Sequence, residues 1–104
     1  MRKVTFYIDD TQYYRNLYDI TDEQHRKIFK DITTFKAIYT LYGDMETAVR
    51  FTLTDYDGNK LDINKLNDYI TGIILNDCLN YFSTESSNPD KYPCGVIKIE
   101  ETEE

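Results

Sequence analysis

The sequence contains few of the residues from which catalytic and metal sites are built. Its 104 residues include no tryptophan, one histidine (His25), two cysteines and four scattered glycines. Isolated glycines form no phosphate-cradling loop, and Cys78 and Cys94 do not have the spacing of a metal-ligand pair. We therefore expect a protein that is not an enzyme, with no catalytic residue, no metal site and no cofactor.

Long apolar runs are also missing. No stretch approaches the roughly 18–20 apolar residues that are needed to cross a bilayer. The N-terminal segment begins with basic residues but reaches Asp9 and Asp10 too soon for a secretory signal. Two cysteines suit a reducing compartment better than a disulfide scaffold, although a Cys78–Cys94 disulfide stays open at this point. These features predict a cytoplasmic protein that does not bind membranes.

The net negative charge of the chain comes entirely from its second half. Residues 1–50 hold eight basic and eight acidic side chains, whereas residues 51–104 hold four basic and eleven acidic ones, so the second half supplies the net charge of −7. An acidic surface repels nucleic acid phosphates and anionic lipid head groups. We therefore expect no direct nucleic acid binding, and an acidity that serves either solubility or a basic protein partner.

Two patterns dominate the first half. Residues 3–8 alternate apolar and polar side chains, which predicts a half-buried strand. Thr21–Gln24 has the form of a capping box, and the apolar residues that follow recur every three or four positions up to Gly43. This spacing predicts a helix over about residues 22–42. A competing interpretation makes residues 34–42 a strand, because that stretch is rich in β-formers.

The second half alternates strand and helix patterns. Residues 47–54 predict a strand, followed by a turn at Asp57–Gly58. Asp62 is a candidate N-cap for a second helix that runs to about Phe82, and residues 95–100 predict a last strand. Along the strand 47–54, the alternation predicts that three apolar side chains point inward: Val49, Phe51 and Leu53.

The expected fold class is α+β, with the element order β-α-β-(β)-α-β. This order gives a three- to four-stranded sheet with two helices on one face. If residues 34–42 form a strand, the order becomes the βαββαβ of a ferredoxin-like arrangement. The hydrophobic content of 40%, with ten tyrosines and five phenylalanines, is typical of one globular domain over residues 1–104. We expect that domain to end in a frayed acidic tail at about 101–104.

The segment Asp55–Asp62 resembles the start of a calcium loop, because oxygen side chains alternate along it. The resemblance fails where the loop needs glycine, an apolar residue and a bidentate glutamate, since Lys60, Asp62 and Leu66 stand there. A turn followed by a helix cap explains the same residues. His25 has no candidate nucleophile near it in the sequence, so we expect it to lie on the surface. We expect Cys78 to be a thiol of the core.

These patterns predict a small acidic, non-enzymatic domain that binds another protein with a basic surface. A sharper version is an inhibitor of the phage or mobile-element type, which occupies a nucleic-acid-binding surface of its target with fixed negative charge. The alternative is an assembly subunit that self-associates through a helix seam or a sheet edge. The candidate partner-binding residues combine carboxylates and tyrosines of the second half: Asp55, Tyr56, Asp57, Asp68, Tyr69 and Asp77.

Overall fold

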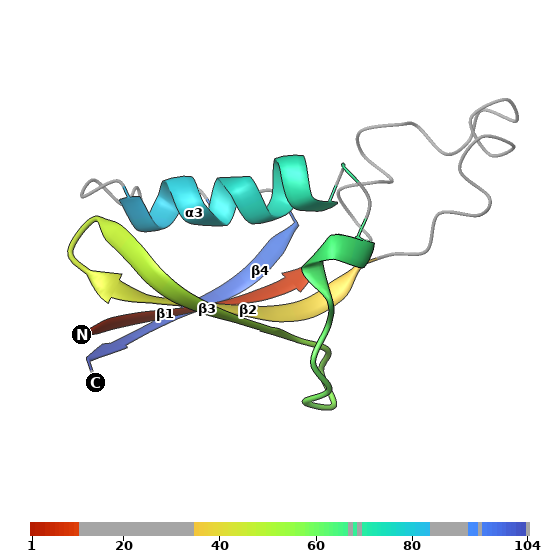
Figure 1. The fold of residues 1–104 in the computed structure, drawn as a ribbon, viewed down its shortest axis with the longest axis horizontal. Helices are drawn as coiled ribbons and strands as arrows, with labels where there is room; N and C mark the ends of the chain where they lie inside the picture. Colours follow the sequence, from red (N-terminus) through yellow and green to blue (C-terminus); the bar gives the residue numbers. More distant parts are fainter. Residues whose placement is uncertain (11–34, 67, 69, 84–91, 94, 104) are drawn as a thin grey trace, which may run out of the picture.

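The structure, a computed structural model, describes residues 1–10, 35–66, 68, 70–83, 92, 93 and 95–103. Within these ranges the chain forms an antiparallel sheet and one main helix that lies across it (Figure 1). The helix has a π-helical first part, η2, which leads directly into α3. The elements are β1 (Arg2–Asp9), β2 (Lys36–Asp44), β3 (Thr47–Thr54), the 3-10 turn η1 (Ile63–Lys65), η2 (Ile70–Leu75), α3 (Asn76–Ser83) and β4 (Val96–Glu103).

The sheet has the strand order β3-β2-β1-β4, with every neighbouring pair antiparallel. Successive side chains of a strand point to opposite faces, so the register decides which residues meet. Val4 lies opposite Leu41, and Phe6 lies opposite Tyr39, on the face that carries the helix. The alternation predicted for residues 3–8 is therefore confirmed, and β1 lies between two neighbours.

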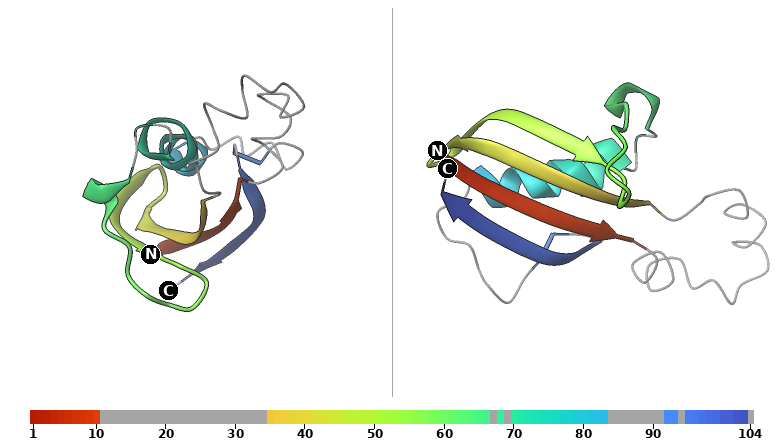
Figure 2. Two further views of the ribbon diagram at one scale, coloured as in Figure 1. Left: turned by 90° about the vertical axis from the view of Figure 1, so that its right-hand side faces the viewer. Right: turned by 90° about the horizontal axis from the view of Figure 1, so that it is seen from below.

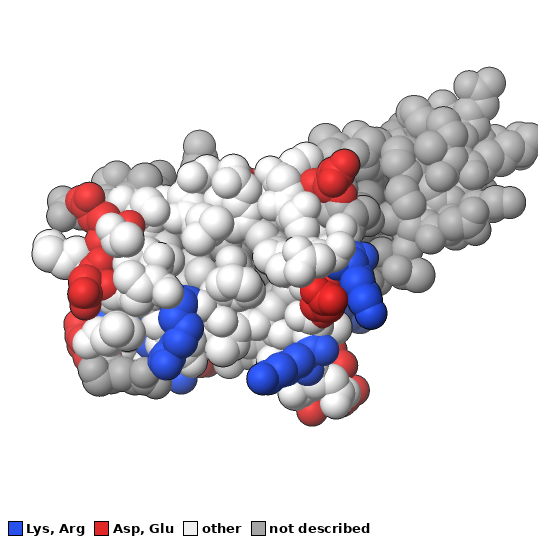
Figure 3. Space-filling model, viewed as in Figure 1, with Lys and Arg blue, Asp and Glu red and all other residues white. Residues whose placement is uncertain are grey.

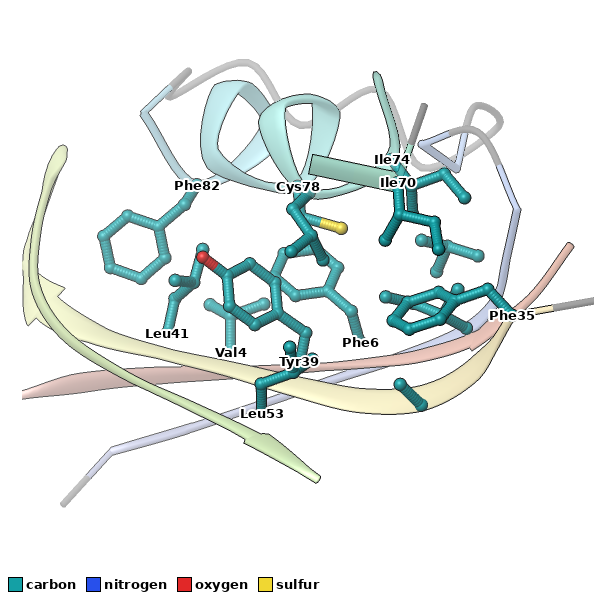
Figure 4. Packing of buried hydrophobic residues seen from close by; sticks show 14 residues of the cluster. Val4, Phe6, Phe35, Tyr39, Leu41, Leu53, Ile70, Ile74, Cys78 and Phe82 are labelled. Atoms are coloured by element: carbon teal, nitrogen blue, oxygen red, sulfur yellow. The ribbon is translucent and has the colours of Figure 1, made fainter. Parts of the chain in front are cut away.

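The core lies between the helix and this face of the sheet. Ile70, Ile74, Cys78 and Phe82 point from the helix toward the strands (Figure 4). The sheet curves around the helix, and its opposite face is left uncovered by other described elements (Figure 2). Each fully buried apolar side chain of this size contributes about 1.5–3 kcal/mol. The sheet contributes further buried side chains: Val4, Phe6, Ile8, Phe35, Ala37, Tyr39, Leu41, Leu53 and Val96.

The helix predicted over residues 22–42 is wrong for its second half, because Lys36–Asp44 is the strand β2. Burial alternates along the first part of this strand, where Ala37, Tyr39 and Leu41 are buried. The competing interpretation of residues 34–42 as a strand is confirmed from Lys36 onward. Residues 22–34 lie outside the described residues. Within the described residues the structure thus shows an α+β fold with one main helix, whereas the sequence predicted two.

The ferredoxin-like alternative does not match the strand pairing. In a split βαβ unit, the two strands joined by a crossover run parallel. Here β1 and β2 are antiparallel neighbours. The connection between them therefore returns the chain beside the strand that it left.

The second predicted helix begins later than expected. Asp62 does cap a turn, because its Oδ1 accepts a hydrogen bond from the Asn64 backbone N–H at 3.0 Å. That turn is only the 3-10 turn η1, and the helix proper starts at Ile70. The wide π-helical turns of η2 rotate Ile73 away from the core, and it is 40% exposed.

The predicted acidic tail at 101–104 is wrong at least through Glu103. β4 continues to Glu103 and pairs with the start of β1, where Arg2 lies opposite Glu103. The Arg2 guanidinium forms an ion pair with Glu101, and the N-terminal ammonium lies 3.5 Å from the Glu103 carboxylate. Glu101 and Glu103 thus pair with positive groups at the start of β1. The two ends of the chain lie side by side (Figure 1).

Only one of the three residues predicted to point inward from β3 is buried. Leu53 is buried, whereas Phe51 and Val49 are exposed. The register between β2 and β3 shifts between Tyr42 and Gly43, so Val49 is an extra residue in a β-bulge. The bulge turns Ala48 toward the core side in place of Val49.

We predict that Gly43→Ala destabilises the protein by about 1–3 kcal/mol, because a side chain is forced into closed packing. A Cβ at Gly43 would lie 1.9 Å from the Thr47 backbone oxygen, across the hairpin. Gly72→Ala is the control, since a Cβ there meets nothing within 4 Å and Gly72 lies in the helix. That control is expected to gain up to about 1 kcal/mol from helix propensity. Urea unfolding of both variants tests the pair, and equal stability would contradict the assignment of the bulge.

Candidate functional site

The predicted carboxylate Asp55 stabilises its own turn. Its Oδ1 accepts hydrogen bonds from the backbone N–H groups of Asp57 and Asn59, both at 2.9 Å, and its Oδ2 accepts one from Asn59 Nδ2 at 3.0 Å. These bonds, the Asn59 backbone N–H first, lower the pKa of Asp55 below its ordinary value. Asp55 therefore has a structural role.

Tyr56 is tied to the sheet in a similar way. Its hydroxyl donates a hydrogen bond to the Ile8 carbonyl at 2.8 Å, and partial burial, followed by the nearby Asp9 charge, raises its pKa. Asp57 is exposed. The loop that carries these residues hangs from the sheet on the side away from α3 (Figure 1).

The other predicted partner-binding residues lie elsewhere. Asp68 is exposed just before η2, and Asp77 is partly buried in the first turn of α3, so both belong to the helix layer. Tyr69, like His25 and Cys94, lies outside the described residues. The structure thus brings Asp55, Tyr56 and Asp57 together in one loop but does not join them to Asp68 and Asp77 in one surface.

The Cys78 side chain is fully buried in the core. This place agrees with the core position predicted for Cys78 from the sequence. Cys94, with which the sequence left a disulfide open, lies outside the described residues.

Exposed apolar side chains gather on the hairpin of β2 and β3. Met45 is 72% exposed, Val49 62% and Phe51 46%. Val49 is exposed because of the bulge, and Phe51 because β3 is an edge strand. The Phe51 ring still packs against Tyr39, edge to face, with ring centroids 5.7 Å apart, so its position is fixed.

The helix adds one apolar residue on the same side. Leu79 is 38% exposed and lies one turn after the buried Leu75, hence on the same helix side. The helix is right-handed and runs from right to left in Figure 1, so the side that carries Leu75 and Leu79 faces β3. We call Met45, Val49, Phe51 and Leu79 the β3–α3 face. Its middle is largely uncharged, and the charged side chains that this view shows lie around its margin (Figure 3).

The two edges of the sheet differ in charge. β4 carries Glu100, Glu101 and Glu103 and has a register shift opposite Tyr7 and Ile8. Both edge strands contain a bulge, so the difference between them is charge, which is a usual protection of an edge strand against unwanted pairing. β3 carries one charged residue, Arg50, whose guanidinium lies 4.1 Å from the Tyr42 ring centroid. The β3 edge is therefore the less protected of the two.

Local sequence patterns do not indicate this face. Val49 and Phe51 alternate like core residues, and nothing in the sequence marks Leu79 as exposed beside a strand. Only the strand order shows that β3 is an edge. The single local signal is Gly43, which marks close approach in the hairpin.

Asp10, at the end of β1, is a buried carboxylate. It is fully buried, and its Oδ1 accepts a hydrogen bond from the Phe35 backbone N–H at 2.6 Å. Among the described residues, none donates to its Oδ2. Burial raises the pKa of Asp10 from 3.8 to about 6 against the lowering effect of the Phe35 bond. Gly95 packs so closely that a Cβ there would lie 3.2 Å from the Asp10 Cβ.

The described part of the chain holds no cluster of three or more His, Cys, Asp or Glu residues that suits a metal ion. Nor does any helix within the described ranges have the length and apolar character to span a membrane. Comparison with models of protein families, with curated proteins and with solved structures found no match to this chain.

We predict that Asp10→Asn removes a pH-dependent loss of stability. Because the folded-state pKa of Asp10 is raised, its contribution is fully present below about pH 4 and is lost as the pH rises through about 6. At about 1.4 kcal/mol per pKa unit, the full loss is about 3 kcal/mol. Urea unfolding at pH 4 and pH 7 should show this difference between wild type and Asp10→Asn. Asp57→Asn, at an exposed carboxylate, is the control, and an Asp10→Asn variant with the wild-type pH response refutes the assignment.

Proposed function

We propose that this chain is a non-enzymatic protein-binding domain and that it contacts its partner through the β3–α3 face. The observation that carries the proposal is an exposed apolar surface on an edge strand with a single charged residue, while the opposite edge of the sheet carries three glutamates. Interface centres are depleted in charge and enriched in aromatic and methionine side chains. Exposed apolar patches of folded proteins frequently mark such contacts.

Phe51 is the expected anchor of this contact. Its ring is already held against Tyr39, so binding costs little side-chain entropy, and nearly half of its surface is still available. Buried aromatic anchors carry a large part of the binding energy in most interfaces. Val49 precedes Phe51 on the same strand, and Leu79 lies on the side of the helix that faces β3.

The carboxylates have a smaller part in this proposal than in the inhibitor predicted from the sequence, which would bind a basic surface through its negative charge. Asp55 is engaged in its turn, and Asp68 and Asp77 lie in the helix layer. A partner that bound mainly through these charges would be released by salt, since screening shortens the Debye length to a few Å at about 1 M. A partner bound through the β3–α3 face is expected to stay bound.

We predict that Leu79→Asp abolishes partner binding and that Ile73→Asp does not. The two residues are matched, since both are exposed apolar residues of the same helix, 38% and 40% exposed. Ile73 lies on the other side of the helix. The test is quantitative affinity capture from a lysate at 0.15 and 0.5 M salt, after circular dichroism has shown both variants to be folded.

The expected result is a protein retained by wild type and by Ile73→Asp at both salt concentrations, and reduced at least tenfold with Leu79→Asp. Retention that is unaffected by Leu79→Asp, or that is lost at 0.5 M salt, contradicts the proposal. Sedimentation over a concentration series separates self-association from a foreign partner, because the alternative of an assembly subunit predicts a persistent dimer or larger closed assembly.

A further inference from the structure

The outer side of β3 already accepts a short added strand from the same chain. Lys60 forms an antiparallel bridge with Thr54, and the Leu61 backbone N–H donates to the Leu53 carbonyl at 3.0 Å. The chain then leaves this line at Asp62, which caps η1. The outer side of β3 thus has the geometry of a pairing edge, and only its last two residues are covered in this way.

The open part of the edge presents backbone groups at Phe51. The Leu53 carbonyl points outward, since it bonds to Leu61 rather than to β2. Residues two apart in an antiparallel strand direct their peptide groups to the same side, and no register shift separates Phe51 from Leu53. The amide and carbonyl of Phe51 therefore point outward, where no described segment pairs with them.

Side chains around this edge define the chemistry of an incoming strand. Phe51 points to the helix side of the sheet and Arg50 to the uncovered side, because Phe51 lies opposite the buried Leu41 and Arg50 opposite Tyr42. Arg50 is the only charged residue in Thr47–Thr54, and Lys60 lies next to its end. An alternating strand with an apolar residue beside Phe51 and an acidic residue beside Arg50 complements both.

We propose that the partner binds by adding an extended strand, antiparallel to Arg50–Thr52, in continuation of the line begun by Lys60 and Leu61. This inference rests on the proposed function and names the form of the partner. Main-chain hydrogen bonds supply affinity in this mode of recognition, and alternate side chains supply specificity. The β4 edge, which carries three glutamates, does not take this role.

The test uses a displayed library of random dodecapeptides, selected on the immobilised full chain. Selected peptides are expected to alternate apolar and acidic residues, and to lose at least tenfold in affinity with Phe51→Thr. Threonine keeps β-propensity and removes the ring. Ile97→Thr is the matched control, because Ile97 is 60% exposed on the other edge strand, and it is expected to leave affinity unchanged.

Backbone pairing is tested separately by N-methylation of the best peptide. Two sets of peptides are made, one methylated at the odd-numbered amides and one at the even-numbered amides; these sets are the two phases. Because only every second amide faces β3, one phase should lose at least tenfold in affinity and the other should stay within about twofold of the unmethylated peptide. Equal effects of the two phases overturn strand addition. So does a peptide that is sensitive to Ile97→Thr but not to Phe51→Thr.

The two proposals fail in different ways. If capture from the lysate depends on Leu79 but no peptide binds with the two-phase pattern, strand addition is wrong and the protein-binding proposal stands. If a selected peptide shows the two-phase pattern and the Phe51 dependence, strand addition is supported whatever the lysate retains. Dimerisation of the full chain that is abolished by Phe51→Thr and competes with the peptides assigns the edge to a second copy and overturns the proposal of a foreign strand.

Discussion

One helix has to cover a four-stranded sheet, and most features of this molecule follow from that constraint. Strands spaced about 4.8 Å apart make a sheet about 15 Å wide before side chains are added, whereas a helix with its side chains is about 10–12 Å across. Curvature brings the inner strands under the helix, and Val4, Phe6 and Leu41 become fully buried. The edge strands keep part of their inner faces exposed, which is why Phe51 points toward the helix side and is still accessible.

Polar contacts fix the two ends of this arrangement. At one end Arg2 donates hydrogen bonds of 2.7 Å to the carbonyls of Met45 and Phe82, stacks on the Phe82 ring at 4.5 Å and pairs with Glu101. A single guanidinium thereby joins the hairpin, the end of α3 and β4. At the other end, Asp10 bonds to Phe35 and holds the start of β2 beside the end of β1.

Sequence patterns predicted the strands better than their surroundings. Alternating apolar and polar residues located β1 and β3, because successive side chains of a strand point to opposite faces of the sheet. In β2, Ile38 and Tyr42 are apolar residues on the face away from the helix, whereas Tyr39 and Leu41 are buried on the other face. Apolar residues on both faces produce a spacing in the sequence that resembles the period of a helix. The bulge at Val49 left no trace in β3 itself, since no glycine or proline stands there. The candidate site depends on that bulge and on strand order, neither of which local patterns contain.

The acidic residues behind the net charge of −7 have other roles in this structure than the partner binding that the sequence predicted. Glutamates lie along β4, where they oppose pairing with foreign strands, and aspartates shape the turns at Asp55 and Asp62. Net negative charge also keeps copies apart in solution. If β3 receives a foreign strand as proposed, the glutamates of β4 restrict strand pairing to one edge of the sheet. Specificity of this kind needs both the attraction at one edge and the repulsion at the other.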